Sequence, residues 1–180
     1  DELSGDGFFG EKTWEKAESA MQKRALSRAL EKGKLAPGDI DFVFAGDLLN
    51  QCIGSSFSLR HFGIPFYGLY GACSTMGEGL SLAALLLDGG FGVTAAAMTS
   101  SHFCTAERQY RMPVPYGSQR TPTAQWTATA AGCTVLTAEG EGPYVTHVTC
   151  GKIVDRGITD ANNMGAAMAP AAYATLSAFF

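Results

Sequence analysis

The sequence lacks the cysteine and histidine patterns of disulfide-bonded and zinc-binding domains. Its five cysteines are an odd number, and no two of them form a C-x-x-C pair. Each lies among apolar or small residues, which favours reduced thiols in a cytosol-like compartment. The three histidines, His61, His102 and His147, are too scattered for the ligand spacing of a structural zinc site.

Charged residues and long apolar runs are also scarce. Only 17% of the residues are charged, the net charge is −4, and no basic block is present, which argues against a nucleic-acid surface. A membrane-spanning helix needs about 18 consecutive apolar residues. No apolar run of this sequence is that long, because Asp88 and two glycines interrupt even GLSLAALLLDGGFG. The sequence starts at Asp1 and shows no signal peptide, although a missing N-terminal segment would hide one.

Apolar residues and glycine are plentiful instead. Of the 180 residues 46% are hydrophobic, and 22 glycines stand against 7 prolines. This composition favours an α/β protein with tight strand-to-helix turns. The length fits one domain, or one half of a larger, internally duplicated domain.

Hydrophobic periodicity predicts an alternating order of helices and strands. In the first helix, Trp14, Ala17, Met21, Ala25 and Ala29 form the expected apolar stripe, and Thr13 is the expected N-cap. We expect helices over residues 13–33, 54–62, 73–87 and 162–180, and strands over 39–47, 65–71, 91–101, 127–138 and 144–155. The last two strands are expected to form a hairpin. The alternation through residue 100 predicts parallel strands with right-handed crossovers.

Polar or reactive residues follow three of these strands. Asp47 follows the first, Cys73 the second, and Ser100, Ser101 and His102 end the third. Ligands of parallel sheets bind outside the carboxyl ends of the strands, so these residues are expected to meet at one edge. This convergence is the main functional signal in the pattern.

Cys73 stands at the expected start of a buried helix, in YGACSTMGEGL. A helix start offers unpaired amides and the positive end of the helix dipole, which stabilise a thiolate or a bound anion. Gly71 would permit a sharp turn there, and Gly77 would permit close packing of the helix. The thiol therefore either attacks a substrate or lines a binding site, and inert packing is the ordinary alternative for a buried cysteine.

Each of the other candidate residues has a structural alternative to a role in the site. His102 is either a proton partner of Cys73 or donor to a ligand carboxylate, or an ordinary hydrogen-bonding residue. Asp47 either faces the site or caps the turn after it. Arg120 either binds a ligand carboxylate or pairs with a structural acid. Ser101 is included because of its place at the strand exit.

Several phrases resemble a known family. A cysteine that opens a buried helix after a strand and Gly-Ala is typical of the thiolase and ketoacyl-synthase superfamily. The more specific phrases are FAGDLLNQ, YGACSTMGEGL, TSSHFCTAERQYR, TPTAQWTATAAGC and THVTCGKIVDRGITDANNMGAAMAPAA. Together they are similar, over nearly the whole chain, to the thiolase-like stage V sporulation protein AD family of spore-forming bacteria.

The resemblance implies a duplicated thiolase fold, with two α/β halves in αβαβα layers. Residues 1–140 would then be the N-terminal half, and residues 141–180 the start of a truncated C-terminal half. By position Cys73 matches the thiolase nucleophile, while the remaining catalytic groups would belong to the second half. Thiolase-like chains commonly dimerise through their N-terminal halves, so a homodimer with an edge at residues 127–138 is expected.

The family belongs to a set of proteins that moves dipicolinic acid, with calcium, across the inner membrane of the developing spore. The resemblance therefore implies a peripheral protein of the forespore or spore inner membrane that binds dipicolinic acid, free or as its calcium chelate, beside other proteins of the uptake system. It implies no cofactor beyond calcium as part of the ligand, and no thiolase activity. The expected ligand-binding residues are Cys73, His102, Arg120, Asp47 and Ser101. Tyr70, Phe103, Tyr110 or Trp126 would supply a stacking face.

Two other functions stay open from the residues. One is acyl transfer from coenzyme A, with Cys73 as the nucleophile of a thioester exchange. The other is a structural subunit that keeps the fold as a scaffold and binds no ligand.

Overall fold

The computed structural model describes residues 6–111 and 127–180. Its sheet has four strands in the order β2-β1-β3-β4. Their bounds are Phe42–Gly46 for β1, Phe66–Leu69 for β2, Thr94–Ser101 for β3 and Ala130–Thr137 for β4. β1 pairs in parallel with both β2 and β3, which confirms the predicted parallel arrangement, and β4 pairs antiparallel with β3.

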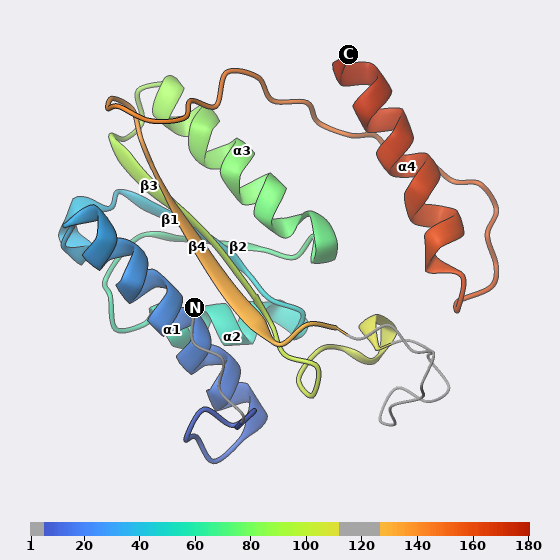
Figure 1. Ribbon diagram of the computed structural model, residues 1–180, viewed down its shortest axis with the longest axis horizontal. Helices are drawn as coiled ribbons and strands as arrows, with labels where there is room; N and C mark the ends of the chain where they lie inside the picture. The colour runs from blue at the N-terminus through green and yellow to red at the C-terminus, as the bar shows by residue number, and fades with distance from the viewer. Residues whose placement is uncertain (1–5, 112–126) are drawn as a thin grey trace.

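Helices cover both faces of this sheet. α1 and α2 lie on one face and α3 on the other, while α4 stands apart from the sheet at the end of a long segment (Figure 1). The bounds are Trp14–Gly33 for α1, Ile53–Leu59 for α2, Thr75–Asp88 for α3 and Met164–Phe179 for α4. Single 3-10 turns are η1 Pro37–Asp39, η2 Asn50–Cys52, η3 Ala72–Ser74 and η4 Arg108–Tyr110. No helix in the described part of the chain is long and apolar enough to cross a membrane.

The period of two along the strands divides the core between the two faces. The cluster under α1 and α2 consists of Leu26, Leu30, Ile40, Val43, Ala45, Leu59, Ile64, Ala96 and Met98. The cluster under α3 consists of Phe44, Ala83, Leu87 and Ala95. Neighbouring residues of β1 thus point to opposite helix layers, which is the helix–sheet–helix arrangement expected for one half of a thiolase-like fold.

The buried face of α1 differs from the apolar stripe that the sequence predicted. The predicted cap is confirmed, since the Thr13 hydroxyl accepts from the amide of Lys16 at 3.3 Å. The buried residues of the helix are Ala17, Glu18, Met21, Gln22, Leu26 and Leu30. Ala25 and Ala29 are only half-buried. Two leucines bury more apolar surface than two alanines, so the helix turns Leu26 and Leu30 to the sheet.

The predicted hairpin of residues 127–138 and 144–155 is wrong. β4 finds its partner in β3, from Thr94 opposite Thr137 to Ser101 opposite Ala130. Residues 144–155 form no strand and are largely exposed, Ile153 fully so. Pairing with β3 packs Cys133 and Val135 of β4 against the larger core cluster. This burial of apolar side chains favours pairing of β4 with β3. A turn signal between two adjacent segments does not show whether their pairing would bury such side chains.

Close packing explains two glycines, Gly46 at the end of β1 and Gly79 on α3. A Cβ on Gly46 would lie 2.2 Å from the carbonyl oxygen of Leu69 and 2.5 Å from Cγ2 of Thr75. On α3, Gly79 packs onto the sheet, where a Cβ would meet that of Ala97 at 3.3 Å. The prediction that Gly77 allows this packing is wrong, because Gly77 is exposed and a Cβ there would meet nothing within 4 Å.

We expect Gly46→Ala to lower the free energy of unfolding by about 3 kcal/mol, because the new methyl collides with backbone that cannot move aside. The matched variant Gly77→Ala lies on exposed helix and should raise it by about 0.5–1 kcal/mol. Urea unfolding of both variants measures the difference. Equal stability of the two would contradict the close approach of β1 to β2 and α3.

Candidate functional site

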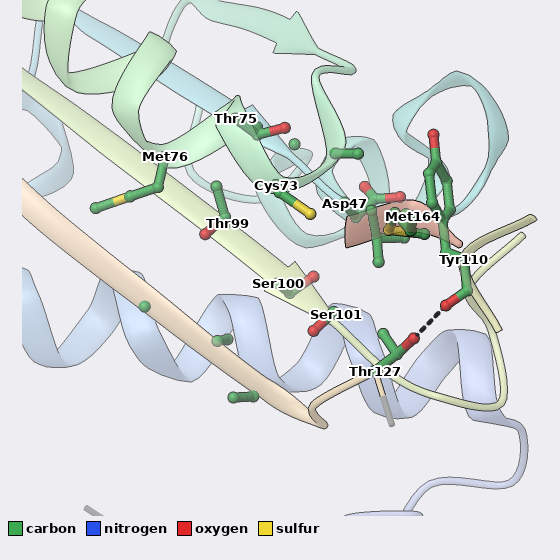
Figure 2. A pocket seen from close by; sticks show the side chains of 16 residues that line it. Asp47, Cys73, Thr75, Met76, Thr99, Ser100, Ser101, Tyr110, Thr127 and Met164 are labelled. Carbon is green, nitrogen blue, oxygen red and sulfur yellow. Dashed lines mark hydrogen bonds between the residues drawn. The ribbon is translucent and has the colours of Figure 1, made fainter. Parts of the chain in front are cut away.

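The carboxyl ends of β1, β2 and β3 border an open cavity with a volume of about 530 Å³. Figure 2 shows Asp47, Cys73, Ser100 and Ser101 around it. Asp47 follows β1, Cys73 follows β2, and the two serines end β3. The lining is completed by residues of β1, β3, β4, η3, α3 and η4, of two connecting segments and by the first residue of α4: Gly46, Leu48, Ala72, Thr75, Met76, Thr99, Tyr110, Thr127, Ala130, Ala131, Gly132 and Met164. The predicted meeting of strand exits thus holds for four of the five named residues, Asp47, Cys73, Ser100 and Ser101, and fails for His102.

Cys73 lies on a strained turn rather than in the helix itself. α3 begins at Thr75, and Cys73 occupies the η3 turn just before it. Ala72 has a φ of 50°, in the left-handed region that alanine rarely adopts. The turn holds the Cys73 side chain exposed at the cavity wall. The thiol is therefore neither sealed in the core nor remote from the cavity.

The same turn leaves backbone amides at the cavity edge. Its first backbone bond runs from the amide of Ser74 to the carbonyl of Gly71 at 3.1 Å. The amides of Ala72 and Cys73 precede that bond, so the turn itself gives them no acceptor. The Ser74 hydroxyl also donates to the Gly71 carbonyl, at 2.8 Å. Amides in this position can donate to a carboxylate or to a developing oxyanion.

Asp47 lies at the cavity but acts as a cap within the fold. Its carboxylate accepts from the amide of Leu49 at 2.9 Å, from the amide of Ser55 at 2.8 Å and from the Ser55 hydroxyl at 2.7 Å. Only 2% of Asp47 is exposed. Both carboxylate oxygens are thus used to fix the turn from β1 to α2, which is the capping role that the sequence left open.

The structure places His102 away from this cavity. Its Nδ1 accepts from the amide of Cys104 at 3.1 Å, so Nε2 carries the proton of the neutral ring and donates to the carbonyl of Gly7 at 2.9 Å. The ring packs against Trp14 with centroids 5.1 Å apart. His102 therefore does not join Cys73, because its side chain points to the other face of the sheet and ties the N-terminal segment to it.

Some of the remaining candidate residues line the cavity, and others lie outside the residues that the structure describes. Ser101 lines the cavity, and its hydroxyl donates to the carbonyl of Ala128. Arg120 and Trp126 lie outside the described residues. Of the aromatic candidates, Tyr110 lines the cavity, and its carbonyl accepts from the Thr127 hydroxyl at 2.7 Å.

Beneath the strand exits lies a buried polar network that the sequence reading missed. Glu18 of α1 is fully buried, and its carboxylate accepts from the Ser100 hydroxyl at 2.7 Å and from the Thr105 hydroxyl. Gln22, one turn further on, donates to the carbonyl of Gly46 at 3.2 Å and to the Ser55 hydroxyl at 3.0 Å. A signal was available, because Glu18 and Gln22 extend the four-residue ladder of Leu26 and Leu30.

Burial sets the acidity of several groups in this region. Desolvation raises the pKa of Glu18, the hydrogen bonds from Thr105 and Ser100 oppose this, and the nearby charge of Asp47 adds to it. Desolvation also raises the pKa of the Cys52 thiol, whose Sγ donates to the carbonyl of Leu69 at 3.2 Å. Burial and a hydrogen bond with Tyr110 raise the pKa of Tyr70 to about 12, so this phenol keeps its proton at neutral pH.

Solved structures share this arrangement of sheet and helices. The chain resembles the priming β-ketosynthase of the R1128 polyketide pathway, with a TM-score of 0.51 and 19% identity over 66% of this chain and 34% of that one. It also resembles 3-oxoacyl-[acyl-carrier-protein] synthase III from Aquifex aeolicus VF5, with a TM-score of 0.51 and 17% identity over 73% and 40% of the two chains. At such identities the likeness shows the fold, which is thiolase-like.

The sequence comparisons identify the family within this fold class. The family model described as Stage V sporulation protein AD (SpoVAD) matches residues 1–180, so the chain belongs to that sporulation protein family. Stage V sporulation protein AD of Bacillus subtilis (strain 168) is 46% identical over 170 residues, which is 94% of this chain. The chain spans 50% of the length of that relative. The division at residue 140 stays a prediction.

The raised pKa of Glu18 predicts a dependence of stability on pH. Between the ordinary pKa of a glutamate and the raised one, the folded state binds more protons than the unfolded state. The stability that this proton uptake contributes is therefore lost as pH rises through the folded pKa. We expect Glu18→Gln to gain stability relative to the parent protein as pH rises above the ordinary pKa of a glutamate, measured by urea unfolding. Glu15→Gln, at an exposed position of the same helix, should keep the parent's profile, and an unchanged profile in Glu18→Gln would refute the assignment.

Proposed function

We propose that the protein binds dipicolinic acid, free or as its calcium chelate, during uptake into the developing spore, and that it does so in the strand-end cavity without thiolase activity. Membership of the SpoVAD family supports the sporulation role, and the family resemblance supplies the ligand. The observation that supports the choice of site is the η3 turn, where Ala72 and Cys73 line an open cavity and the turn itself gives their amides no acceptor.

The cavity suits a flat molecule with carboxylates at its ends. Peptide amides at the start of a helical segment donate to a carboxylate, as they would to an oxyanion in a thiolase-like enzyme. Met76, Met164 and alanines of β4 supply an apolar wall for a pyridine ring, and Tyr110 offers an aromatic face. A rigid planar ligand loses little conformational freedom on binding, which favours affinity.

The charges of the described walls favour the calcium chelate over the free dianion. The lining that the structure describes contains the carboxylate of Asp47 and no lysine or arginine. A dianion would meet this carboxylate without a compensating cation, whereas calcium cancels the ligand's own charge. Within the described residues no three His, Cys, Asp or Glu side chains gather around a point, so the ligand itself would bring and hold the ion.

An acyltransferase that uses Cys73 as its nucleophile is the second candidate. Its support is the exposed thiol of Cys73 on a strained turn, beside amides to which the turn gives no acceptor. A thioester would form at this thiol. The described cavity lining contains no histidine to take the proton of the thiol. Incubation with a short acyl-CoA separates the two functions, because only acyl transfer adds the acyl mass to the Cys73 peptide and releases free CoA.

We also propose that the protein is a peripheral component of the inner membrane of the forespore or spore, where it acts with other proteins of the same uptake system.

We further propose that the protein forms a homodimer through the free edge of β4. β4 pairs only with β3 among the described strands, so its other edge has backbone groups available for a partner strand. A monomeric mass in analytical ultracentrifugation of the full-length protein would refute the dimer.

We expect calorimetry to detect binding of dipicolinate to the full-length protein, and tighter binding when calcium is present. Cys73→Phe places a ring in the cavity and should weaken the affinity at least about tenfold, equivalent to about 1.4 kcal/mol. Cys104→Phe is the matched control, because Cys104 is also exposed and does not line the cavity. Equal affinity of the two variants would place the site elsewhere, and tighter binding of the free dianion would refute the charge argument alone.

A further inference from the structure

A second hollow lies on the outer side of the α1–α2 layer, away from the strand-end cavity. It has a volume of about 590 Å³ and lies between the first turns of α1 and the length of α2. Figure 1 shows both helices on the face of the sheet opposite to α3. The residues that line this hollow, here called the α1–α2 groove, are Glu11, Thr13, Glu15, Lys16, Ser19, Ala20, Lys23, Ile53, Phe57, Ser58, Arg60 and His61.

The groove has an apolar floor that the fold leaves uncovered. Ile53 is 41% exposed and Phe57 is 54% exposed, although both belong to a helix whose other side is buried. The guanidinium of Arg60 lies 5.1 Å from the centre of the Phe57 ring, and its Nε donates to Nε2 of His61 at 3.0 Å. These contacts hold a cation beside the exposed ring, so the groove presents apolar surface and positive charge together.

Positive charge is concentrated here against the charge of the whole chain. The groove is lined by three cationic side chains, Lys16, Lys23 and Arg60, and by two acidic ones, Glu11 and Glu15. The chain as a whole has a net charge of −4. Such segregation of charge attracts an anionic partner and steers its approach.

The shape of the groove favours a peptide segment over a membrane. A bilayer receives apolar side chains that protrude from a surface, whereas Ile53 and Phe57 line a hollow that can receive a side chain from a partner. Lys16 and Lys23 are seven residues apart on α1, which places them about 10 Å apart along the helix axis. Two cations at that spacing can meet successive carboxylates of one segment.

We propose that the α1–α2 groove docks an acidic segment of a partner protein, whose bulky apolar side chain packs on Ile53 and Phe57 while its carboxylates meet Lys16, Lys23 and Arg60. The dock is separate from the strand-end cavity and does not depend on dipicolinate binding. It gives this chain a means of assembly with another protein through side chains that neither the core nor the cavity uses.

The test uses the full-length protein and a fluorescein-labelled peptide of repeated Glu-Leu-Glu-Phe units at low salt, read by fluorescence anisotropy. We expect saturable binding that weakens as salt rises. The triple variant Lys16→Glu, Lys23→Glu, Arg60→Glu should lose at least about tenfold in affinity, because attraction becomes repulsion. The matched variant Lys32→Glu, Lys152→Glu, Arg156→Glu changes the net charge equally at exposed positions outside the groove and should bind as the parent does.

Phe57→Ala keeps every charge and tests the apolar contact separately, so the proposal stays testable if the triple variant does not fold. It should weaken binding several-fold, and Phe57→Leu should restore most of the affinity. Equal binding by the two triple variants, or no effect of Phe57→Ala, would overturn the proposal. Binding to vesicles of phosphatidylglycerol and phosphatidylcholine without binding to the peptide would overturn it in favour of a membrane surface.

Discussion

The fold depends on a carboxylate that α1 carries into the protein interior. A buried charge is costly unless hydrogen bonds compensate it, and Glu18 obtains them from Ser100 and Thr105. One turn along the helix, Gln22 bonds to the exit of β1 and to the hydroxyl of Ser55. The helix is thereby tied to the ends of β1 and β3 and to the start of α2. No other register of α1 would satisfy these groups, so the network fixes the helix against the sheet.

The hydrogen-bond network of Glu18 and Gln22 positions the strand-end cavity, although neither side chain lines it. Ser100 presents one side to Glu18 and borders the cavity on the other, while Asp47 is held by Ser55 within the same network. The strained η3 turn is held by bonds of its own, from the amide of Gly71 to the Thr75 hydroxyl and from the amide and hydroxyl of Ser74 to the carbonyl of Gly71. The α1–α2 groove lies on the outer side of these two helices, whose described residues do not line the cavity, so the two sites are separate.

Local patterns predicted most of the elements, because hydrophobic period and capping are local properties. The N-cap at Thr13, the parallel pairing of β1 with β2 and β3, and the helix from Met164 all agree with the sequence reading. The errors concern contacts between distant segments. The partner of β4 is β3 rather than residues 144–155, since burial against α1 outweighs a nearby turn. Likewise Gly79, not Gly77, meets the sheet, because only the packed orientation of α3 shows which glycine faces inward.

The sequence by itself determined the thiolase-like class, the family and the gathering of Asp47, Cys73 and Ser101 at one sheet edge. Parallel strands followed by polar residues require that gathering, whatever the side chains then do. Only the tertiary structure decided the roles: Asp47 caps a turn, His102 ties the N-terminal segment, and Glu18 supports the site from beneath. Which way a side chain points, and whether its polar atoms are already bonded, depends on neighbours brought from far along the chain. No local pattern contains those neighbours.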